Sequence, residues 1–557
     1  MWLISTESLA LEFFVDPPKG SYAVLSHTWD GGEVSFQEVK DLGNARKKKG
    51  FAKIERTCEL ARRRNLPYAW VDTCCIDKSS SAELSETINS MFQWYRESAV
   101  CFAFLSDLRS RPEIGSEPPQ SDKWFEQSFP GCRWLRRGWT LQELIAPPHV
   151  EFYDMTWTMR TSKAAHTLFL SRETGIDVNV LEDSACLSQI LISRRMSWAA
   201  GRETTRIEDM AYCLLGIFDI NMPMIYGEGK KAFMRLQEEI AKQSCDLSLF
   251  AWRAQSPGQG NDFQSYRGIF ARWPTEFTKC RQMRPRNRGP IEKEFTITNK
   301  GLRLEATLVN VLDETRDLVF NLGVCEYSDL PKNSANGWMG LYLTKTARGY
   351  VRARPHEMYT AGQERKGRLR CEKAVLHIRK DLSLAESLSL NSQYRHAIRF
   401  RNVTGENYCL RGMIQPEDLW DSKRMLFLDQ GSGLNAFVVL KYPMSKVHQV
   451  CDFQVVIACS TMDAPMCVIW SEQDKTQWNK VLHHMQTSRE ITDYVAYDYL
   501  QRYFGEFAPR RTQSTCYFQD PNSGRKAAVE ARLKVDKFEG MECFCIEVRH
   551  SYCFSPR

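Results

Sequence analysis

The sequence predicts an α/β domain at the N-terminus, then a helical extension, then a β-rich C-terminal region. In residues 1–150, short apolar runs alternate with stretches of helical periodicity, as in a mainly parallel sheet with flanking helices. Residues 151–255 have a mostly helical pattern. Residues 256–557 contain short, β-branched runs separated by Gly, Pro and Asn, which are typical of a β-sandwich or barrel. We therefore expect three domains within these limits.

The composition is that of a folded protein with well-developed cores. Of 557 residues, 43% are hydrophobic and 11% aromatic, which excludes wholesale disorder and collagen-like repeats. The formal net charge of +7 is small for this length and does not indicate a nucleic-acid-binding protein. The first residues lack a basic n-region, no window approaches roughly 18 apolar residues, and the cysteines lie mostly in apolar runs. We expect a cytoplasmic protein with reduced thiols and no membrane span.

The α/β pattern begins with two strands and the helices around them. Strands are expected at residues 22–26 (YAVLS) and 68–72 (YAWVD). Between them, residues 51–64 place apolar side chains at helical spacing. Ser80 and Glu83 fit a capping box that opens the next helix.

The rest of the domain repeats this alternation. A third strand is expected at residues 100–105 (VCFAFL), followed by a loop over about 107–121. A helix then ends at Pro147 and Pro148, because proline cannot continue it. The next strand is VEFYD, residues 150–154. In the extension, the clearest helices are expected at residues 204–218 and 227–243, and the intervening residues form a loop.

Several familiar motifs are missing. Residues 227–230 (GEGK) lack the spacing of a phosphate-binding P-loop, and neither G-x-S-x-G nor H-E-x-x-H occurs. The nearest approach to a zinc site is Cys543 and Cys545, with His550 and Cys553. Alternation places the first two cysteines on one face of a strand, which favours core packing. We predict no metal site.

Polar residues gather where the first two strands end. Ser26, His27 and Trp29 follow the first strand, and Asp72 and Cys75 follow the second. In an open α/β sheet, ligands bind beyond the carboxyl ends of the strands. We therefore expect these side chains to border a binding crevice.

Trp139 and Glu143 lie near the start of the last helix of this domain. A carboxylate, an imidazole and an indole in one crevice can hold a ribose and stack a planar base. The alternative is structural: Asp72 caps a turn, Trp139 belongs to the core, and Glu143 is a first-turn carboxylate favoured by the helix dipole. Spacing alone favours the structural alternative.

Three segments resemble the fungal HET (heterokaryon incompatibility) domain: LSHTW at 25–29, AWVDTCCIDK at 69–78 and RGWTLQELIAP at 137–147. The family pattern is a strand ending in LS-x-x-W, then W-[IV]-D-x-x-C-I, then R-x-W-x-x-Q-E. The resemblance covers roughly residues 20–150. Residues 194–240 also resemble the extension that follows this domain in vegetative incompatibility proteins.

The sequence departs from the family pattern in two respects. Asp77-Lys78 stands where many members carry Asn-Gln after the Cys-Ile, which weakens any role for an amide there. Family members often continue into a nucleotide-binding NACHT module and WD repeats, and neither is visible in this sequence.

HET domains are considered distantly similar to TIR domains, which implies a TIR- or flavodoxin-like fold. Residues 139–144, WTLQEL, resemble the W-C-x-x-E-L stretch whose Glu is catalytic in NAD-cleaving TIR enzymes. The resemblance therefore makes Glu143 the catalytic candidate, because a carboxylate near the ribose can stabilise an oxocarbenium-like state. The candidate NAD-binding residues are Ser26, His27, Trp29, Asp72, Cys75 and Trp139.

The resemblance implies a cell-death effector in fungal non-self recognition, that is, in heterokaryon incompatibility. The first hypothesis is a NAD glycohydrolase that acts on self-association, with NAD as substrate and no bound cofactor. The second is a non-enzymatic signalling module that acts through homotypic contacts with other HET or incompatibility proteins. A nucleic-acid partner is not expected.

Overall fold

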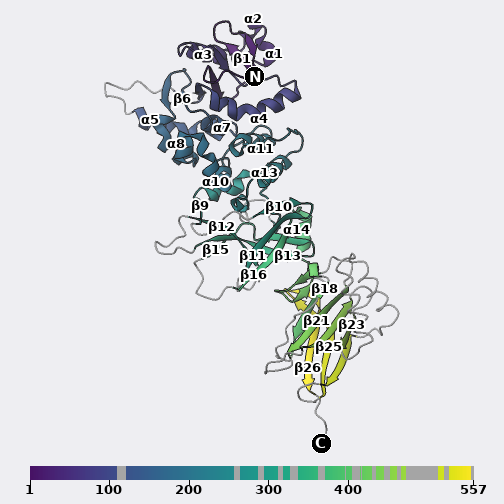
Figure 1. The fold of residues 1–557 in the computed structure, drawn as a ribbon. Helices are drawn as coiled ribbons and strands as arrows, with labels where there is room; N and C mark the ends of the chain where they lie inside the picture. Colours follow the sequence, from purple (N-terminus) through teal and green to yellow (C-terminus); the bar gives the residue numbers. More distant parts are fainter. Residues whose placement is uncertain are drawn as a thin grey trace.

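In the computed structural model, four regions follow one another along the molecule (Figure 1). They are an α/β domain, a helical region, a barrel and a pair of sheets. This order confirms the predicted succession of α/β, helical and β-rich parts. The structure describes residues 1–109, 121–255, 264–286, 294–310, 318–326, 337–361, 370–394, 397–403, 414–415, 417–428, 435–443, 452–460, 466–471, 512–519 and 526–552.

The α/β domain is a seven-stranded sheet with helices packed against it. Its strands are β1 (Trp2–Ser5), β2 (Leu11–Phe13), β3 (Tyr22–His27), β4 (Tyr68–Trp70), β5 (Val100–Phe104), β6 (Val150–Tyr153) and β7 (Met159–Ser162). Its helices are α1 (Phe36–Val39), α2 (Leu42–Ala45), α3 (Phe51–Arg62), α4 (Ser81–Glu97), α5 (Ser121–Ser128), α6 (Arg133–Arg136) and α7 (Thr140–Ile145). Most of the predicted loop before α5, residues 110–120, lies outside the described residues.

The centre of this sheet is parallel and its edges are antiparallel. The strand order is β2-β1-β4-β3-β5-β6-β7, in which β4, β3, β5 and β6 run parallel. The chain leaves β3 for β4 on one side and then returns to pair β5 on the other side. This reversal makes the carboxyl ends of β3 and β5 a topological switch point, where open α/β sheets bind ligands.

Helix α4 begins where the sequence predicts, but only half of the capping box forms. The Ser80 hydroxyl accepts a hydrogen bond from the Glu83 amide at 3.3 Å. The Glu83 carboxylate accepts instead from the amide of Asp77, at 3.0 Å. The predicted reciprocal bond is therefore wrong, because Glu83 anchors the loop that precedes the helix.

The helical region consists of short helices rather than long ones. Its α-helices are α8 (Thr167–Thr174), α9 (Val178–Glu182), α10 (Ile192–Ser197), α11 (Asp209–Tyr212), α12 (Leu215–Phe218) and α13 (Lys231–Gln243). The helix predicted at 204–218 is wrong as a continuous element, since it is divided into α11 and α12. The helix predicted at 227–243 forms from Lys231 onward.

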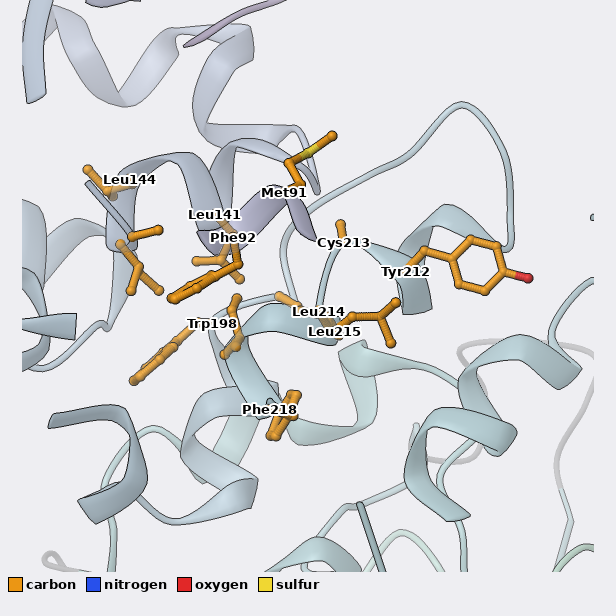
Figure 2. Packing of buried hydrophobic residues seen from close by; sticks show 14 of the residues in the cluster. Met91, Phe92, Leu141, Leu144, Trp198, Tyr212, Cys213, Leu214, Leu215 and Phe218 are labelled. Carbon is orange, nitrogen blue, oxygen red and sulfur yellow. The ribbon is translucent and has the colours of Figure 1, made fainter. Parts of the chain in front are cut away.

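A close approach between α12 and α4 joins the first two regions. Phe92 and Met91 of α4 pack with Leu141 and Leu144 of α7 against Trp198 and the α12 segment (Figure 2). A Cβ atom at Gly216 would lie 2.1 Å from the Cβ atom of Phe92. Only glycine therefore allows the two helices to pack at this distance.

The third region is a nine-stranded sheet that closes on itself. Its strands are β8 (Tyr266–Arg267), β9 (Met283–Pro285), β10 (Phe295–Thr298), β11 (Gly301–Asn310), β12 (Leu318–Glu326), β13 (Met339–Thr346), β14 (Gly349–Ala353), β15 (Tyr359–Thr360) and β16 (Arg370–Ile378). The pairings run β11-β16-β14-β13-β12 and return from β12 to β11. These pairings describe a barrel. Helix α14 (Leu384–Leu390) contacts β8 at its side.

The fourth region contains a six-stranded and a four-stranded sheet. Its strands are β17 (Ile398–Asn402), β18 (Ile414–Gln415), β19 (Trp420–Asp421), β20 (Leu426–Phe427), β21 (Asn435–Pro443), β22 (Asp452–Ser460), β23 (Met466–Ser471), β24 (Gln513–Gln519), β25 (Lys526–Phe538) and β26 (Met541–Tyr552). Buried residues of both sheets, such as Ile457 and Ile546, share one core. The two sheets thus form a sandwich.

Hydrophobic cores group the four regions into two bodies. One core runs from Met1 through the helical region to Ile378 of the barrel. Separate clusters, which begin at Tyr394 and Ile398, fill the sandwich. The α/β domain, the helical region and most of the barrel therefore share one interior, although Val309, Val319, Trp338 and Tyr359 form a further small cluster in the barrel. The sandwich has clusters of its own, against which Ala347 of the barrel packs.

Cys543 and Cys545 are both buried in β26, as their predicted place on one strand face requires. Cys553 of the same predicted cluster lies outside the described residues. Within the described part of the chain, no group of acidic, His and Cys side chains has the geometry of a metal site. Over the same residues, no helix is both long enough and apolar enough to cross a bilayer.

Candidate functional site

A buried hydrogen-bonded chain lies at the carboxyl end of β3. The Ser26 hydroxyl donates to Glu143 Oε2 at 2.5 Å and accepts from the Trp134 indole Nε1 at 2.8 Å. All three side chains are buried, with Ser26 and Trp134 fully enclosed. The structure thus brings together two predicted site residues, Ser26 and Glu143, that are 117 positions apart.

The segment that carries Glu143 is held by its own side chains. The Thr140 hydroxyl lies 2.5 Å from the carbonyl of Trp134 and 2.9 Å from that of Arg137. It thereby ties the first turn of α7 to the end of α6. Gln142, next to Glu143, is also buried.

The helical region holds the same segment from the other side. The Gly138 amide donates to the Glu203 carbonyl at 2.8 Å, and the Glu203 amide donates to the Arg136 carbonyl at 2.6 Å. The buried Arg202 guanidinium donates to the Arg137 carbonyl and to the Thr140 hydroxyl, both at 2.9 Å. The position of Glu143 therefore depends on both regions.

The surroundings of Glu143 favour its protonated form. Burial is the largest cause of a rise in its pKa to about 8, and the charge of Asp72 adds to it. The Ser26 hydrogen bond and the charges of Arg137 and Arg202 oppose this rise. A cation placed beside the carboxyl group would shift it toward the ionised form.

His27, Trp29 and Asp72 form a second predicted group that the structure brings together. His27 Nε2 lies 3.0 Å from Asp72 Oδ1, and Trp29 Nε1 donates to Asp72 Oδ2 at 2.9 Å. Lys53 Nζ lies 3.2 Å from His27 Nδ1. Both ring nitrogens of His27 therefore have a polar partner, Lys53 at Nδ1 and Asp72 at Nε2.

Asp72 is ionised, in contrast to Glu143. Burial acts to raise its pKa, but the hydrogen bond and charge of His27, with the charges of Lys78 and Arg137, outweigh burial and lower the pKa to about 2. Two neighbouring carboxyl groups with opposite shifts are a common arrangement for acid–base chemistry. The site therefore offers one fixed negative charge and one carboxyl group that can change state.

Two predicted residues lie elsewhere. The Cys75 sulfur accepts a hydrogen bond from the Val71 amide at 3.4 Å and lies in the hydrophobic core. The Trp139 indole donates to Asp209 of α11 at 3.4 Å. Trp139 thus contacts the helical region, while Ser26 and Glu143 bond to each other.

Three residues of this site are not predicted from the sequence: Lys53, Trp134 and Arg202. Lys53 lies outside the apolar face of the helix predicted at 51–64, although it is buried in the structure. Arg202 gives no sequence signal either, because its partners belong to another region.

Two family models match parts of the chain. Residues 22–127 match the family model described as Heterokaryon incompatibility protein (HET). Residues 231–311, from α13 into the barrel, match a Domain of unknown function (DUF8212). The second match crosses from the helical region into the barrel, which is consistent with their shared core.

One curated relative is the Vegetative incompatibility protein HET-E-1 of Podospora anserina, which is 47% identical over 233 residues. The matched part is 41% of this chain but 17% of the relative, so this chain spans a small part of the relative's length. No solved structure matches the chain.

Proposed function

Because the chain carries a HET domain and through it belongs to the heterokaryon incompatibility family, we propose that it acts as a cell-death effector in vegetative incompatibility. Its effect arises from cleavage of the nicotinamide–ribose bond of NAD when copies of the chain associate. Support comes from the match over residues 22–127 and from the name of the relative, a vegetative incompatibility protein. Its partners in this role are other incompatibility proteins.

The observation that carries the chemical part is the Ser26–Glu143 pair at the switch point of the sheet. The carboxyl group is buried, held by a short hydrogen bond and flanked by the ionised Asp72. Groups with strongly shifted pKa values at such crevices are candidates for catalysis. These features support a reaction in which the Glu143 carboxylate stabilises positive charge that develops on the substrate.

The proposed reaction consumes NAD and water and gives nicotinamide, ADP-ribose and a proton. The bond between the nicotinamide nitrogen and ribose C1′ breaks, and nicotinamide leaves as a neutral molecule with the electron pair. Water then forms a bond to C1′ and releases its proton, through Glu143, to solvent. The ionised Glu143 stabilises the oxocarbenium-like charge on the ribose.

The charge of the substrate explains how Glu143 becomes ionised. Its pKa of about 8 in the free protein keeps the carboxyl group protonated. The nicotinamide–ribose unit is cationic and favours the carboxylate when it lies beside it. Binding of the cationic substrate thus promotes ionisation of Glu143, and the carboxylate then stabilises the transition state.

The test follows nicotinamide release from NAD by the purified full chain, at high concentration and after artificial clustering. We expect release by the parent and a loss of at least 100-fold in Glu143→Gln. Glu126→Gln, which alters a more exposed carboxylate paired with Arg172, should keep the parental rate. Thermal unfolding of each variant confirms that it is folded.

No nicotinamide release by the clustered parent, or equal release by Glu143→Gln, would overturn the catalytic proposal. Overexpression in fungal cells provides a second readout. A Glu143→Gln chain that still kills cells would instead support the non-enzymatic module that acts through homotypic contacts.

A further inference from the structure

Two cations from different segments lie over the partly exposed indole of Trp29. Lys78 Nζ is 3.9 Å and Arg137 Cζ 5.1 Å from the centroid of the Trp29 ring. Lys78 follows β4, whereas Arg137 lies between α6 and α7. The ring is 43% exposed, and its nitrogen is fixed by Asp72. The fold thus brings two positive charges to one place.

The charges of both cations act on the ionised Asp72 and lower its pKa, but from farther away than an ion pair. In the part of the chain that the structure describes, neither Lys78 nor Arg137 forms an ion pair. The nearby Asp72 is bonded to His27 and Trp29, and Asp30 is paired with Lys53 and Arg133. An aromatic ring attracts cations through its quadrupole but does not neutralise them. The pair is therefore able to accept an anion.

We propose that Lys78 and Arg137 bind the phosphate groups of a nucleotide whose reactive end reaches Glu143. Guanidinium and ammonium groups are the usual protein partners of phosphate, and Arg can bind it through two parallel hydrogen bonds. The assignment of the anion to a nucleotide rests on the proposed function, whereas the anion site itself does not.

This assignment changes the role of Trp29. Since both cations lie over its ring, the indole holds them in place and does not stack a base. Arg137 is also fixed through its backbone, because its carbonyl accepts from Arg202 and from Thr140. The same short segment carries Glu143, so the phosphate contact and the reacting carboxyl group are held at a fixed separation.

The test measures binding calorimetrically in a Glu143→Gln background, where no turnover occurs. The probes are ADP-ribose, inorganic pyrophosphate and nicotinamide riboside, which has no phosphate. We expect ADP-ribose to bind and to lose at least 10-fold in affinity on Lys78→Gln/Arg137→Gln. The matched control, Lys242→Gln/Arg172→Gln, removes the same charges from α13 and α8 and should leave binding unchanged.

Trp29 provides a second set of variants. Trp29→Leu should weaken ADP-ribose binding severalfold, whereas Trp29→Phe, which keeps an aromatic face, should weaken it less. The affinity for nicotinamide riboside, which has no phosphate, should be the same in the Lys78→Gln/Arg137→Gln variant as in the Glu143→Gln background. Thermal unfolding checks that all variants keep the parental fold.

The outcomes separate this inference from the proposed function. Unchanged ADP-ribose affinity in the double variant would overturn the anion site, even if NAD is cleaved. Affinity lost in the double variant would support it, even if no NAD is cleaved. If pyrophosphate binds as tightly as ADP-ribose, the anion site is supported but the nucleotide is overturned as its ligand.

Discussion

The first three regions and the sandwich differ in how their hydrophobic cores are organised. From Met1 to Ile378, an α/β sheet, a set of short helices and a barrel share one hydrophobic core. The sandwich has its own core, and its contacts with the barrel include the Lys345 ammonium, which donates to the Trp420 carbonyl at 2.7 Å. The candidate site lies wholly within the larger body.

Because the first three regions share a core, the candidate site cannot be assigned to the α/β domain alone. Ser26 and Glu143 belong to that domain. Arg202 and Glu203 of the helical region, however, form hydrogen bonds to residues 136–140, just before Glu143. Substitutions that destabilise the helical region should therefore displace Glu143, whereas removal of the sandwich should leave its position unchanged. Substitutions in the first body and removal of the sandwich test this difference, and their expected effects decrease in the order given.

Gly216→Val should cause the largest loss. The new Cβ would lie 2.1 Å from that of Phe92, and two packed helices must separate to make room. We expect the first body to lose about 3–5 kcal/mol in urea unfolding, while the sandwich unfolds as before.

The matched control is Gly201→Ala, because nothing lies within 4 Å of a Cβ placed there. Its expected effect on unfolding is under about 1 kcal/mol. A Gly216→Val chain whose two bodies are destabilised equally would contradict the separation of the cores.

Glu143→Gln should make stability less sensitive to pH. The ordinary pKa of a Glu side chain is 4.5, and burial raises the pKa of Glu143 in the folded chain to about 8. Folding thus favours the protonated form, and this stabilisation is complete below pH 4.5 and lost as the pH rises through about 8. Relative to the parent, the variant should gain on the order of 3 kcal/mol between pH 5 and pH 9.

Urea unfolding at both pH values measures this gain, with Glu126→Gln as the control. An equal effect of Glu143→Gln at pH 5 and pH 9 would show that the carboxyl group does not titrate in this range. The sandwich transition should not respond to the substitution at either pH.

Arg202→Met should have an intermediate effect. It keeps a long side chain but leaves the Arg137 carbonyl without the Arg202 guanidinium, at a cost of about 1–3 kcal/mol. It also removes a charge that lowers the pKa of Glu143. The pH dependence of nicotinamide release should therefore shift upward, an effect that a loss of packing alone would not produce.

Removal of the sandwich should have the smallest effect. A chain that ends at residue 393 keeps the whole first core. Its unfolding free energy should match that of the first body in the full chain within about 0.5–1 kcal/mol. Loss of cooperative unfolding in the shortened chain would show that the two bodies depend on each other.

The sequence predicted the elements that local patterns determine. The strand at 22–26, the start of α4 at Ser80 and the stop at Pro147 all depend on residues close in sequence. The break between α11 and α12, at Cys213 and Leu214, was missed because the helical pattern of the sequence runs through it. The close contact at Gly216 was missed because it is tertiary. Gly216 looks like an ordinary helical position until Phe92 packs against it.

The candidate site could be predicted only in part, for a related reason. Polar residues at strand ends placed Ser26, His27 and Asp72 near one another, and family resemblance pointed to Glu143. Periodicity does not reveal pairings between distant segments, so the link from Trp134 to Ser26 and that from Arg202 to α7 were missed.

The backbone bridge between Arg137 and Glu203 has a consequence for how the protein tolerates change. Its hydrogen bonds join main-chain atoms of residues 136–138 to those of Glu203, so they form with any residue at position 203 except proline, which has no amide hydrogen. Point substitutions at this position should therefore be accepted readily. An insertion or deletion close to the bridge would shift its register, and Glu143 would move away from Ser26. At this junction, chain length is constrained more tightly than residue identity.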